Sequence, residues 1–413
     1  MGRLFGGQKA GDLRPLRVGV IFEQPAEVGG GFQQPLNDVL WFSEWAKKSG
    51  NEAIIFTPHR STQQTLKGFG IEAVLLKPGI GDYFVLFLKH CGPFDLVQAA
   101  LQFLSPYEKV LIRREIDVVY FTNPSKWHLL LYKLPFIGTI FDGCHRDAPE
   151  FQEVREFGNF ERREILFRSL ATKAVLVVTN APELIDTLCR RYAMEPDRAI
   201  CIPLSASISV ARSASADEND GAVLKKYGLE PGYLFYPAQF WPHKNHAILL
   251  EALALLREQG VGKRLVLCGS DRGARKNIDM LIAHHDLSRQ VSILGFVDSS
   301  ELAALYRGAT ALVMPSYFGP TNLPPLEAWT VGTPVIYPEA FKAQAGDAAI
   351  LFDYDSPRSL ADAIIALEPA EVREKLRRAG EARLRYFAGE IESGRRRFAA
   401  HLERLRRRLP QLR

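Results

Sequence analysis

Short apolar runs alternate with longer segments of helical periodicity along most of this chain. The runs have no polar face, which is typical of parallel strands that are buried on both sides. The segments between them carry apolar residues at helical spacing, as Leu36, Val39 and Leu40 do. This alternation predicts an α/β fold with doubly wound parallel sheets. The expected strands are 17–22, 53–57, 73–77, 118–121, 136–141, 174–179, 199–203, 233–236, 264–268, 292–294, 310–314 and 333–337.

One segment interrupts the alternation. Residues 205–220 are rich in Ser, Ala and Asp and have little periodicity, which predicts a linker. A chain of 413 residues is also too long for one ordinary core. We therefore expect two Rossmann-like domains, 1–205 and 223–386, joined by a linker at 206–222 and followed by an Arg-rich terminal helix at 387–413.

The composition excludes several classes of protein. No uncharged run approaches the length of a membrane-spanning helix, and residues 1–17 do not resemble a signal peptide. The five cysteines lack C-x-x-C spacing and are expected to be buried thiols in a reducing cytoplasm. The net charge of +5 is mild. It suits phosphorylated ligands or an anionic membrane surface, and no nucleic acid partner is expected.

The most informative loop is 316–329, which joins an expected strand to a short helix. Pro324 and Pro325 suit the first turn of that helix but carry no N–H. An anion bound at the helix start would therefore use the backbone N–H groups just before the prolines, where the helix dipole attracts negative charge. These groups belong to Thr321, Asn322 and Leu323.

Glu327 follows within about one turn, in apolar surroundings. A carboxylate there needs a hydrogen-bonding partner, and a pair of ribose hydroxyls is one candidate. The alternative is an ordinary helix start in which Glu327 only stabilises the helix dipole.

This loop resembles the signature of the group 1 family of retaining glycosyltransferases, which have the GT-B architecture of two Rossmann-like domains facing a cleft. Leu323-Pro324, Glu327-Ala328 and 332–335 match the family pattern, whereas Gly319 stands where the family has the first of two Glu residues. The variant at 318–322 resembles a polysaccharide-building, mannosyltransferase-like branch. The resemblance implies transfer of a hexose from a nucleotide diphosphate sugar, with GDP-mannose as our guess, to a saccharide or lipid-linked saccharide.

The resemblance also assigns residues that follow strands of the second half. Lys244 matches a family Lys that stabilises the charge growing on the leaving diphosphate, while Gln239 replaces the Arg of the same element. Arg272 follows the next strand and could help. Phe296 and Val297 match the segment that frames the nucleobase; core packing is the alternative, and both can hold.

A Gly-rich turn that contains Gly30 and Gly31 follows the first strand, and Pro35 is expected to open the next helix. This strand, turn and helix would let the backbone approach a phosphate, but the spacing is not the dinucleotide fingerprint, so NAD is not expected. In the resembled family a similar turn faces the sugar diphosphate. A plain tight turn is the alternative.

The segment 142–151 resembles a second family element of the first domain. Phe141 occupies the position of a family His, so His145 is the candidate for a sugar contact. A structural His that holds the loop is the alternative.

Residues 82–104 are apolar and aromatic with few charges. They form either an amphipathic surface that faces a membrane, as enzymes with lipid-linked acceptors require, or a pair of core helices.

Asp353 and Asp355 imitate a metal-binding Asp-x-Asp, but their place before a capped helix favours a turn, so no metal or other cofactor is expected.

Together these features predict a cytoplasmic, retaining hexosyltransferase in surface polysaccharide or lipopolysaccharide synthesis, with peripheral contact to the inner face of the plasma membrane as an option. The terminal helix resembles the GT-B segment that crosses back to the first domain.

Two alternative functions stay open. One is a non-catalytic GT-B subunit that binds sugar nucleotide or glycan, and the other is a sugar-nucleotide epimerase, which would need acid/base carboxylates in the cleft. The catalytic candidates are Lys244, Glu327 and His145.

Overall fold

A computed structural model describes residues 14–25, 30–90, 94–213 and 219–409. The chain forms two compact units, each with its own sheet. The first unit comprises Met1–Phe141, Glu164–Ile202 and Glu392–Arg413, and the second comprises Asp142–Arg163 and Pro203–Ile391. Residues 142–163 therefore group with the second unit, although the sequence analysis placed them in the first domain.

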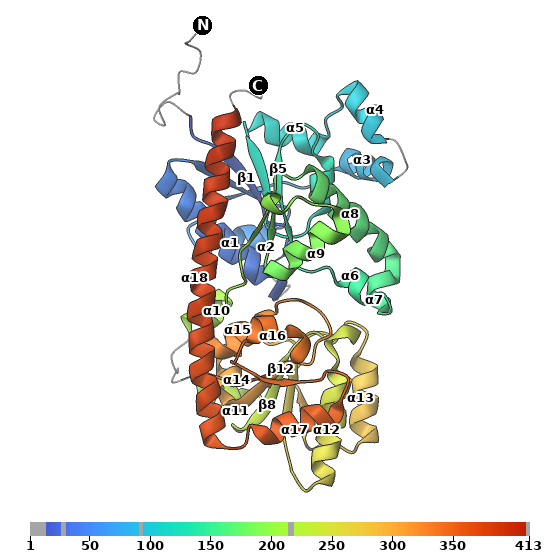
Figure 1. The fold of residues 1–413 in the computed structure, drawn as a ribbon, viewed down its shortest axis with the longest axis vertical. Coiled ribbons are helices and arrows are strands. Elements are labelled where there is room, and N and C mark those ends of the chain that lie inside the picture. Colours follow the sequence, from blue (N-terminus) through green and yellow to red (C-terminus); the bar gives the residue numbers. More distant parts are fainter. Residues whose placement is uncertain (1–13, 26–29, 91–93, 214–218, 410–413) are drawn as a thin grey trace. The chain divides into compact units, whose positions relative to one another are not determined.

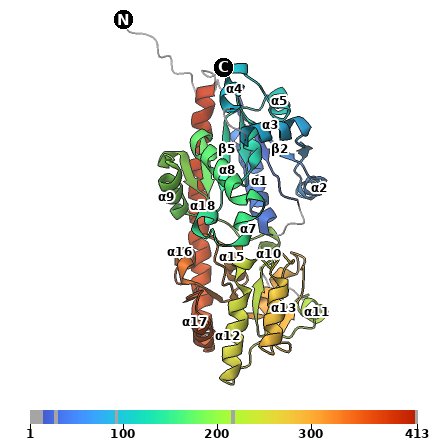
Figure 2. The same ribbon diagram turned by 90° about the vertical axis from the view of Figure 1, so that its right-hand side faces the viewer.

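The first unit holds a seven-stranded parallel sheet in the order β3-β2-β1-β4-β5-β6-β7. Its strands are almost wholly apolar and largely buried, as the apolar runs predict. Figure 2 shows α2 and α9 on opposite sides of this sheet, as the right-handed crossovers of a doubly wound fold require. The strands are β1 Arg17–Ile21, β2 Glu52–Thr57, β3 Ala73–Leu75, β4 Val118–Phe121, β5 Phe136–Ile140, β6 Leu176–Thr179 and β7 Ala199–Cys201.

The helices of the first unit begin with α1, Gly30–Ser49. This helix starts five residues before Pro35, so the predicted helix start is wrong. Glycine is a weak helix former, which hid the first turn from the sequence pattern. The other helices are α2 Arg60–Gly68, α3 Ile80–His90, α4 Phe94–Leu101, α5 Pro106–Arg113, η2 Lys126–Leu130, α8 Asn159–Lys173, which begins in the second unit, α9 Pro182–Tyr192 and η4 Pro196–Arg198.

The second unit repeats the pattern with a six-stranded parallel sheet in the order β10-β9-β8-β11-β12-β13 (Figure 1). Its core joins the sheet to α12, α14, α15 and α17. The strands are β8 Tyr233–Pro237, β9 Leu265–Cys268, β10 Val291–Ile293, β11 Ala309–Val313, β12 Val335–Pro338 and β13 Ile350–Phe352, the last of which the sequence analysis did not identify. The helices are α6 Cys144–Asp147, α7 Gln152–Arg155, η3 Glu156–Gly158, α10 Ile208–Arg212, α11 Asp220–Lys226, η5 Pro242–Lys244, α12 His246–Glu258, α13 Arg275–His284, α14 Leu302–Gly308, α15 Leu323–Thr330, η6 Glu339–Phe341, α16 Lys342–Ala345 and α17 Pro357–Ala366.

The segment expected to be a linker is partly structured. Helix α10 lies within it, Val210 is fully buried and Ser207 is buried as well. Residues 214–218 of the expected linker lie outside the described residues. The Ser-rich composition concealed this short helix, because five residues are too few to show a helical period.

The C-terminal helix α18, Ala370–Arg408, is one unbroken helix of 39 residues and begins well before the terminal helix expected at 387–413 (Figure 1, red). From Glu392 onward its residues belong to the first unit, where Phe398 packs against Phe42 and Tyr120. Among the described residues, no helix combines the length and the apolar character needed to cross a bilayer.

Two glycines inside α18 make a matched test of this packing. A Cβ on Gly394 would lie 2.4 Å from the carbonyl oxygen of Cys201, whereas a Cβ on Gly389 would meet nothing within 4 Å. Gly389→Ala should raise the free energy of unfolding by about 0.5–1 kcal/mol, the usual gain in helix propensity. Gly394→Ala should lower it by about 1–3 kcal/mol, because the backbone of β7 must move. Denaturant unfolding of the full chain measures both, and a stabilised Gly394→Ala would contradict the close packing of α18 on β7.

Candidate functional site

The order of the second sheet determines where its ligand-binding loops lie. Strands β8 and β11 are neighbours, but the chain leaves them toward opposite edges of the sheet. In open parallel sheets the crevice at such a switch point, beyond the carboxyl ends of the strands, binds ligands. The loops in question are 238–245, after β8, and 314–322, after β11.

These two loops contact each other directly. The backbone N–H of Tyr317 donates to the carbonyl oxygen of His243 at 2.9 Å. The ring of His243 stacks on that of Phe318, with centroids 4.3 Å apart and planes 9° from parallel. The loops therefore form one continuous surface at the switch point.

The segment 142–163 covers this surface within the second unit. Glu153 accepts hydrogen bonds from the backbone N–H of His243 at 3.1 Å and from its Nδ1 at 2.8 Å. Burial lowers the pKa of His243, so a neutral imidazole donates its Nδ1–H to the carboxylate. The Phe151 ring lies 5.0 Å from that of Phe318. These contacts explain why residues 142–163 group with the second unit.

Lys244 ends η5 in the loop after β8 and is half-buried. Burial lowers the pKa of its ammonium group to about 8, and the neighbouring Cys144 and Asp142 oppose the shift. Within the described part of the chain no carboxylate forms an ion pair with Lys244, since Asp142 pairs with Arg163 at 2.6 Å. This cation is therefore available to pair with a bound anion, and its catalytic role stays a prediction.

Gln239 lies in the same loop as Lys244. Its Oε1 accepts a hydrogen bond from the indole Nε1 of Trp241 at 3.1 Å. The guanidinium of Arg272 lies 5.8 Å from the Trp241 ring, so a cation does adjoin the position where the family Arg is missing.

The start of α15 offers fewer free amides than the sequence predicted. The backbone N–H of Asn322 donates to Oε1 of Gln344 at 2.7 Å, and its side chain donates to the Tyr337 hydroxyl at 2.7 Å. Asn322 would therefore have to exchange partners to bind a ligand through its amide. Thr321 and Leu323 remain as donor candidates, and the Thr321 hydroxyl is buried without a hydrogen bond among the described residues.

Glu327 is buried in α15 with protein partners that the sequence did not indicate. The Tyr306 hydroxyl donates to its Oε2 at 2.9 Å, and both the hydroxyl and the backbone N–H of Ser207 also bind the carboxylate. Burial raises the pKa of Glu327, and these hydrogen bonds oppose the shift. Its binding to ribose stays a prediction, because these donors already satisfy much of the carboxylate.

Gly319 adopts a φ of +99°, a backbone conformation that side chains with a Cβ rarely adopt. Its N–H also donates to the sulfur of Cys144. A Glu at this position would strain the loop. The backbone conformation therefore suits the Gly that stands in place of the family's first acidic residue.

The two residues expected near a nucleobase lie in different environments. Phe296 is 64% exposed in the loop after β10 and is available for stacking. Val297 is buried in the core of the second unit, where it contributes to packing.

The candidates from the first half also differ. Gly30 and Gly31 form the first turn of α1 in the loop after β1, and β1 and β4 are the switch-point pair of the first sheet. Residues 26–29 of this turn lie outside the described residues. His145, in α6, is fully buried with its ring 5.4 Å from that of Phe160, which favours the structural alternative for this residue.

Comparison with known proteins shows which family the second unit resembles. Residues 223–383 match the family model for group 1 glycosyl transferases. The D-inositol 3-phosphate glycosyltransferase of Corynebacterium glutamicum is 26% identical over 253 residues, 57% of this chain and 59% of the relative. The O-antigen chain mannosyltransferase B of Escherichia coli is 27% identical over 222 residues, 52% of this chain and 58% of the relative. The chain thus spans less than three fifths of the length of either curated relative.

Solved structures share the fold over nearly the whole chain. A glycosyltransferase from Rickettsia africae has a TM-score of 0.68 at 14% identity and covers 94% of this chain and 99% of its own. Anabaena HepE bound to UDP-glucose has a TM-score of 0.67 at 14% identity, with coverages of 92% and 99%. The predicted fold class, two Rossmann-like parallel-sheet domains of the GT-B type, is therefore confirmed.

Two substitutions separate the roles open to Glu327. Glu327→Gln turns an amide N–H toward the hydrogen-bond donors that now bind the carboxylate, which should cost about 1–3 kcal/mol of stability. Tyr306→Phe removes one hydrogen bond but keeps the carboxylate, and should cost about 1 kcal/mol. If Glu327 binds ribose, only Glu327→Gln should also weaken the binding of a nucleoside diphosphate in calorimetry. Equal affinities for the wild type and both variants would remove Glu327 from the donor site.

Proposed function

We propose that this protein is a retaining glycosyltransferase that uses a nucleotide diphosphate sugar. The bond between the anomeric carbon and the diphosphate oxygen breaks, and a bond to an acceptor oxygen forms on the same face of the sugar. The nucleoside diphosphate leaves with added negative charge, and the acceptor hydroxyl proton is released to it. Stabilising this leaving group is the main catalytic demand.

One observation carries the proposal. Lys244 is a half-buried cation without an ion pair in the described chain, in one of two loops that meet at the switch point of the second sheet. The other loop leads into the N-terminus of α15, where the amides of Thr321 and Leu323 and the helix dipole favour an anion. Both loops lie within the matched residues 223–383.

Similar proteins support our choice of donor and acceptor classes. The Escherichia coli relative is named an O-antigen chain mannosyltransferase, and WaaG, described as a glycosyltransferase involved in lipopolysaccharide biosynthesis, shares the fold at a TM-score of 0.62. We therefore take a hexose, mannose from GDP-mannose as the first choice, and a saccharide or lipid-linked saccharide in surface polysaccharide synthesis. The Anabaena structures bind UDP and UDP-glucose, so UDP-linked donors belong in the same test.

A protein cation and amides also make a metal unnecessary in this proposal. The Asp353 carboxylate accepts a hydrogen bond from the backbone N–H of Asp355 at 3.0 Å, which is a turn rather than an open pair of ligands. Activity should accordingly persist in a chelator.

Release of nucleoside diphosphate from GDP-, UDP- and dTDP-sugars, with and without saccharide or lipid-linked acceptors, tests the proposal. We expect acceptor-dependent release with one donor and a product whose anomeric configuration matches that donor in NMR. Lys244→Ala should lower the turnover by about a hundredfold, the loss typical of one preorganised stabilising group. Lys263→Ala, a control in a loop outside the site whose Lys pairs with Glu368, should retain it.

Two other outcomes would replace the proposal. Nucleotide binding without release under any condition would favour a non-catalytic sugar-nucleotide subunit, as the replacements at Gly319 and Gln239 allow. Interconversion of sugar nucleotides without an acceptor would favour an epimerase.

A further inference from the structure

Helices α3 and α4 of the first unit expose their apolar side chains. Ile80 is 91% exposed, and Leu96 and Leu101 are each 73% exposed. Further apolar side chains are exposed on or beside the same helices: Tyr83, Phe84, Phe87, Val97 and Phe103. Figure 1 shows both helices at the edge of the unit, away from its sheet. So many exposed apolar side chains on two adjacent helices of a folded protein mark a surface that binds a partner or a membrane.

Two polar side chains of the same helices, Asp82 and Gln98, are buried. Gln98 is buried and donates from Nε2 to the carbonyl oxygen of Phe103 at 3.0 Å. Asp82 is buried and accepts hydrogen bonds from the backbone N–H groups of Gly79 and Tyr107, each at 2.8 Å. These bonds hold the helices in place with their apolar side outward. Val85 and Leu86 of α3 also pack in the core, so the prediction of core helices for 82–104 holds for one side of this helix.

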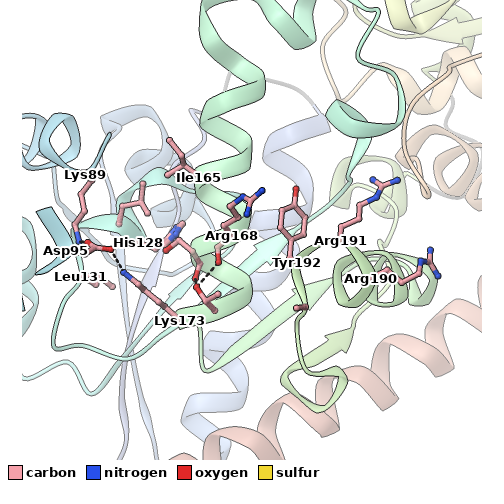
Figure 3. Close-up of a pocket in the computed structure, with 14 residues that line it drawn as sticks. Lys89, Asp95, His128, Leu131, Ile165, Arg168, Lys173, Arg190, Arg191 and Tyr192 are labelled. Carbon is pink, nitrogen blue, oxygen red and sulfur yellow. Dashed lines mark hydrogen bonds and ion pairs between the residues drawn. The ribbon is translucent and has the colours of Figure 1, made fainter. Parts of the chain in front are cut away.

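A cavity of about 630 Å³ adjoins the two helices (Figure 3). Lys89 of α3 and Asp95 of α4 line it, so it is continuous with the helix pair that carries the apolar patch. Its other charged lining residues come from α8 and α9: Arg168, Lys173, Arg190 and Arg191. Asp95 pairs with Lys89 and, at 2.8 Å, with Lys173, so the lining keeps a clear excess of positive charge.

Glu164 and His128, which lie at the cavity, do not cancel this excess of positive charge. Glu164, beside the cavity, pairs with Arg168 at 3.5 Å and accepts a hydrogen bond from Tyr192 at 2.7 Å. His128 lines the cavity and is neutral near pH 7, because burial lowers its pKa to about 4. The positive charge thus comes from the lysines and arginines of the lining.

The cavity is remote from the switch point of its own sheet. Lys173 ends α8, and Arg190 and Arg191 lie in the last turn of α9, just before strands β6 and β7 begin. Gly30 and Gly31 instead follow the carboxyl end of β1. A ligand in the cavity would therefore leave the switch-point loops of this sheet free.

We propose that this face of the first unit docks on an anionic membrane. The apolar side chains of α3 and α4 enter the acyl region, and the cationic cavity takes the phosphate of a phospholipid headgroup. Exposed apolar side chains beside a cluster of cations match the two layers of an anionic bilayer surface, hydrocarbon and phosphate. The inference does not depend on glycosyl transfer, because vesicle binding is measured without any donor.

Cosedimentation of the full chain with vesicles tests the proposal. We expect binding to vesicles of phosphatidylcholine and phosphatidylglycerol at low salt, weakening as salt is added, and little binding to phosphatidylcholine alone. Two double variants, Leu96→Ser with Leu101→Ser and Lys173→Gln with Arg190→Gln, should each weaken the binding about tenfold or more. Thermal unfolding of each variant checks that the fold is kept.

Matched controls separate the site from general charge and hydrophobicity. Lys47→Gln with Lys48→Gln, at the exposed end of α1, and Met280→Ser with Ile365→Ser, in the second unit, should change the binding less than twofold. Equal losses in the controls, equal binding to neutral vesicles, or no binding at all would overturn the proposal. Stabilisation by inorganic phosphate without vesicle binding would do the same and would indicate a soluble phosphorylated ligand. Self-association through the patch without vesicle binding would indicate a second copy of the chain.

Discussion

The partly buried charge of Lys244 is the feature on which the proposed donor site of the second unit depends. Removing an ammonium group from water is costly, and the lowered pKa reflects that cost. No carboxylate of the described chain pairs with it, and the nearby Asp142 is already engaged by Arg163. The folded chain therefore holds a cation whose best partner is a bound anion. The parallel order of the strands places it there, since β8 and β11 are neighbours and the loops that follow them meet.

The contacts around Lys244 involve parts of the chain that are far apart in sequence. Glu153 orients His243, next to Lys244, and Cys144 accepts the N–H of Gly319. Ser207 binds Glu327 from a segment that looks like a linker. Glu153, Cys144 and Ser207 lie outside residues 223–383, the region that matches the family model. These surroundings also accommodate the loss of the first Glu, because Gly319 occupies a backbone conformation that Glu would adopt only with strain.

The sequence predicted the parts of the fold that local patterns determine. Apolar runs located the strands from β1 to β12, and the capped helix expected after Asp355 is α17. The missed features depend on tertiary contacts. Nothing local distinguishes one long α18 from two helices, because its continuity through Gly394 depends on packing against β7. The hydrogen bonds from Asn322 to Gln344 and from Tyr306 to Glu327 join residues about 20 positions apart, and no spacing rule identifies such pairs. The exposure of apolar side chains on α3 and α4 likewise depends on how these helices pack, and the sequence left two alternatives open for them.

Proton uptake on binding of a nucleoside diphosphate tests the role of Lys244 most directly. At pH 8 a group with a pKa of about 8 is about half protonated, and a bound diphosphate should drive it to full protonation. Calorimetric titration of the full chain with GDP and with UDP, in buffers of different ionisation enthalpy, should therefore show uptake of about half a proton at pH 8 for the nucleotide that binds. The uptake should fall toward zero near pH 6 and be absent in Lys244→Gln. Binding with the same proton uptake in the wild type and in Lys244→Gln would contradict the assignment of Lys244 to the diphosphate site.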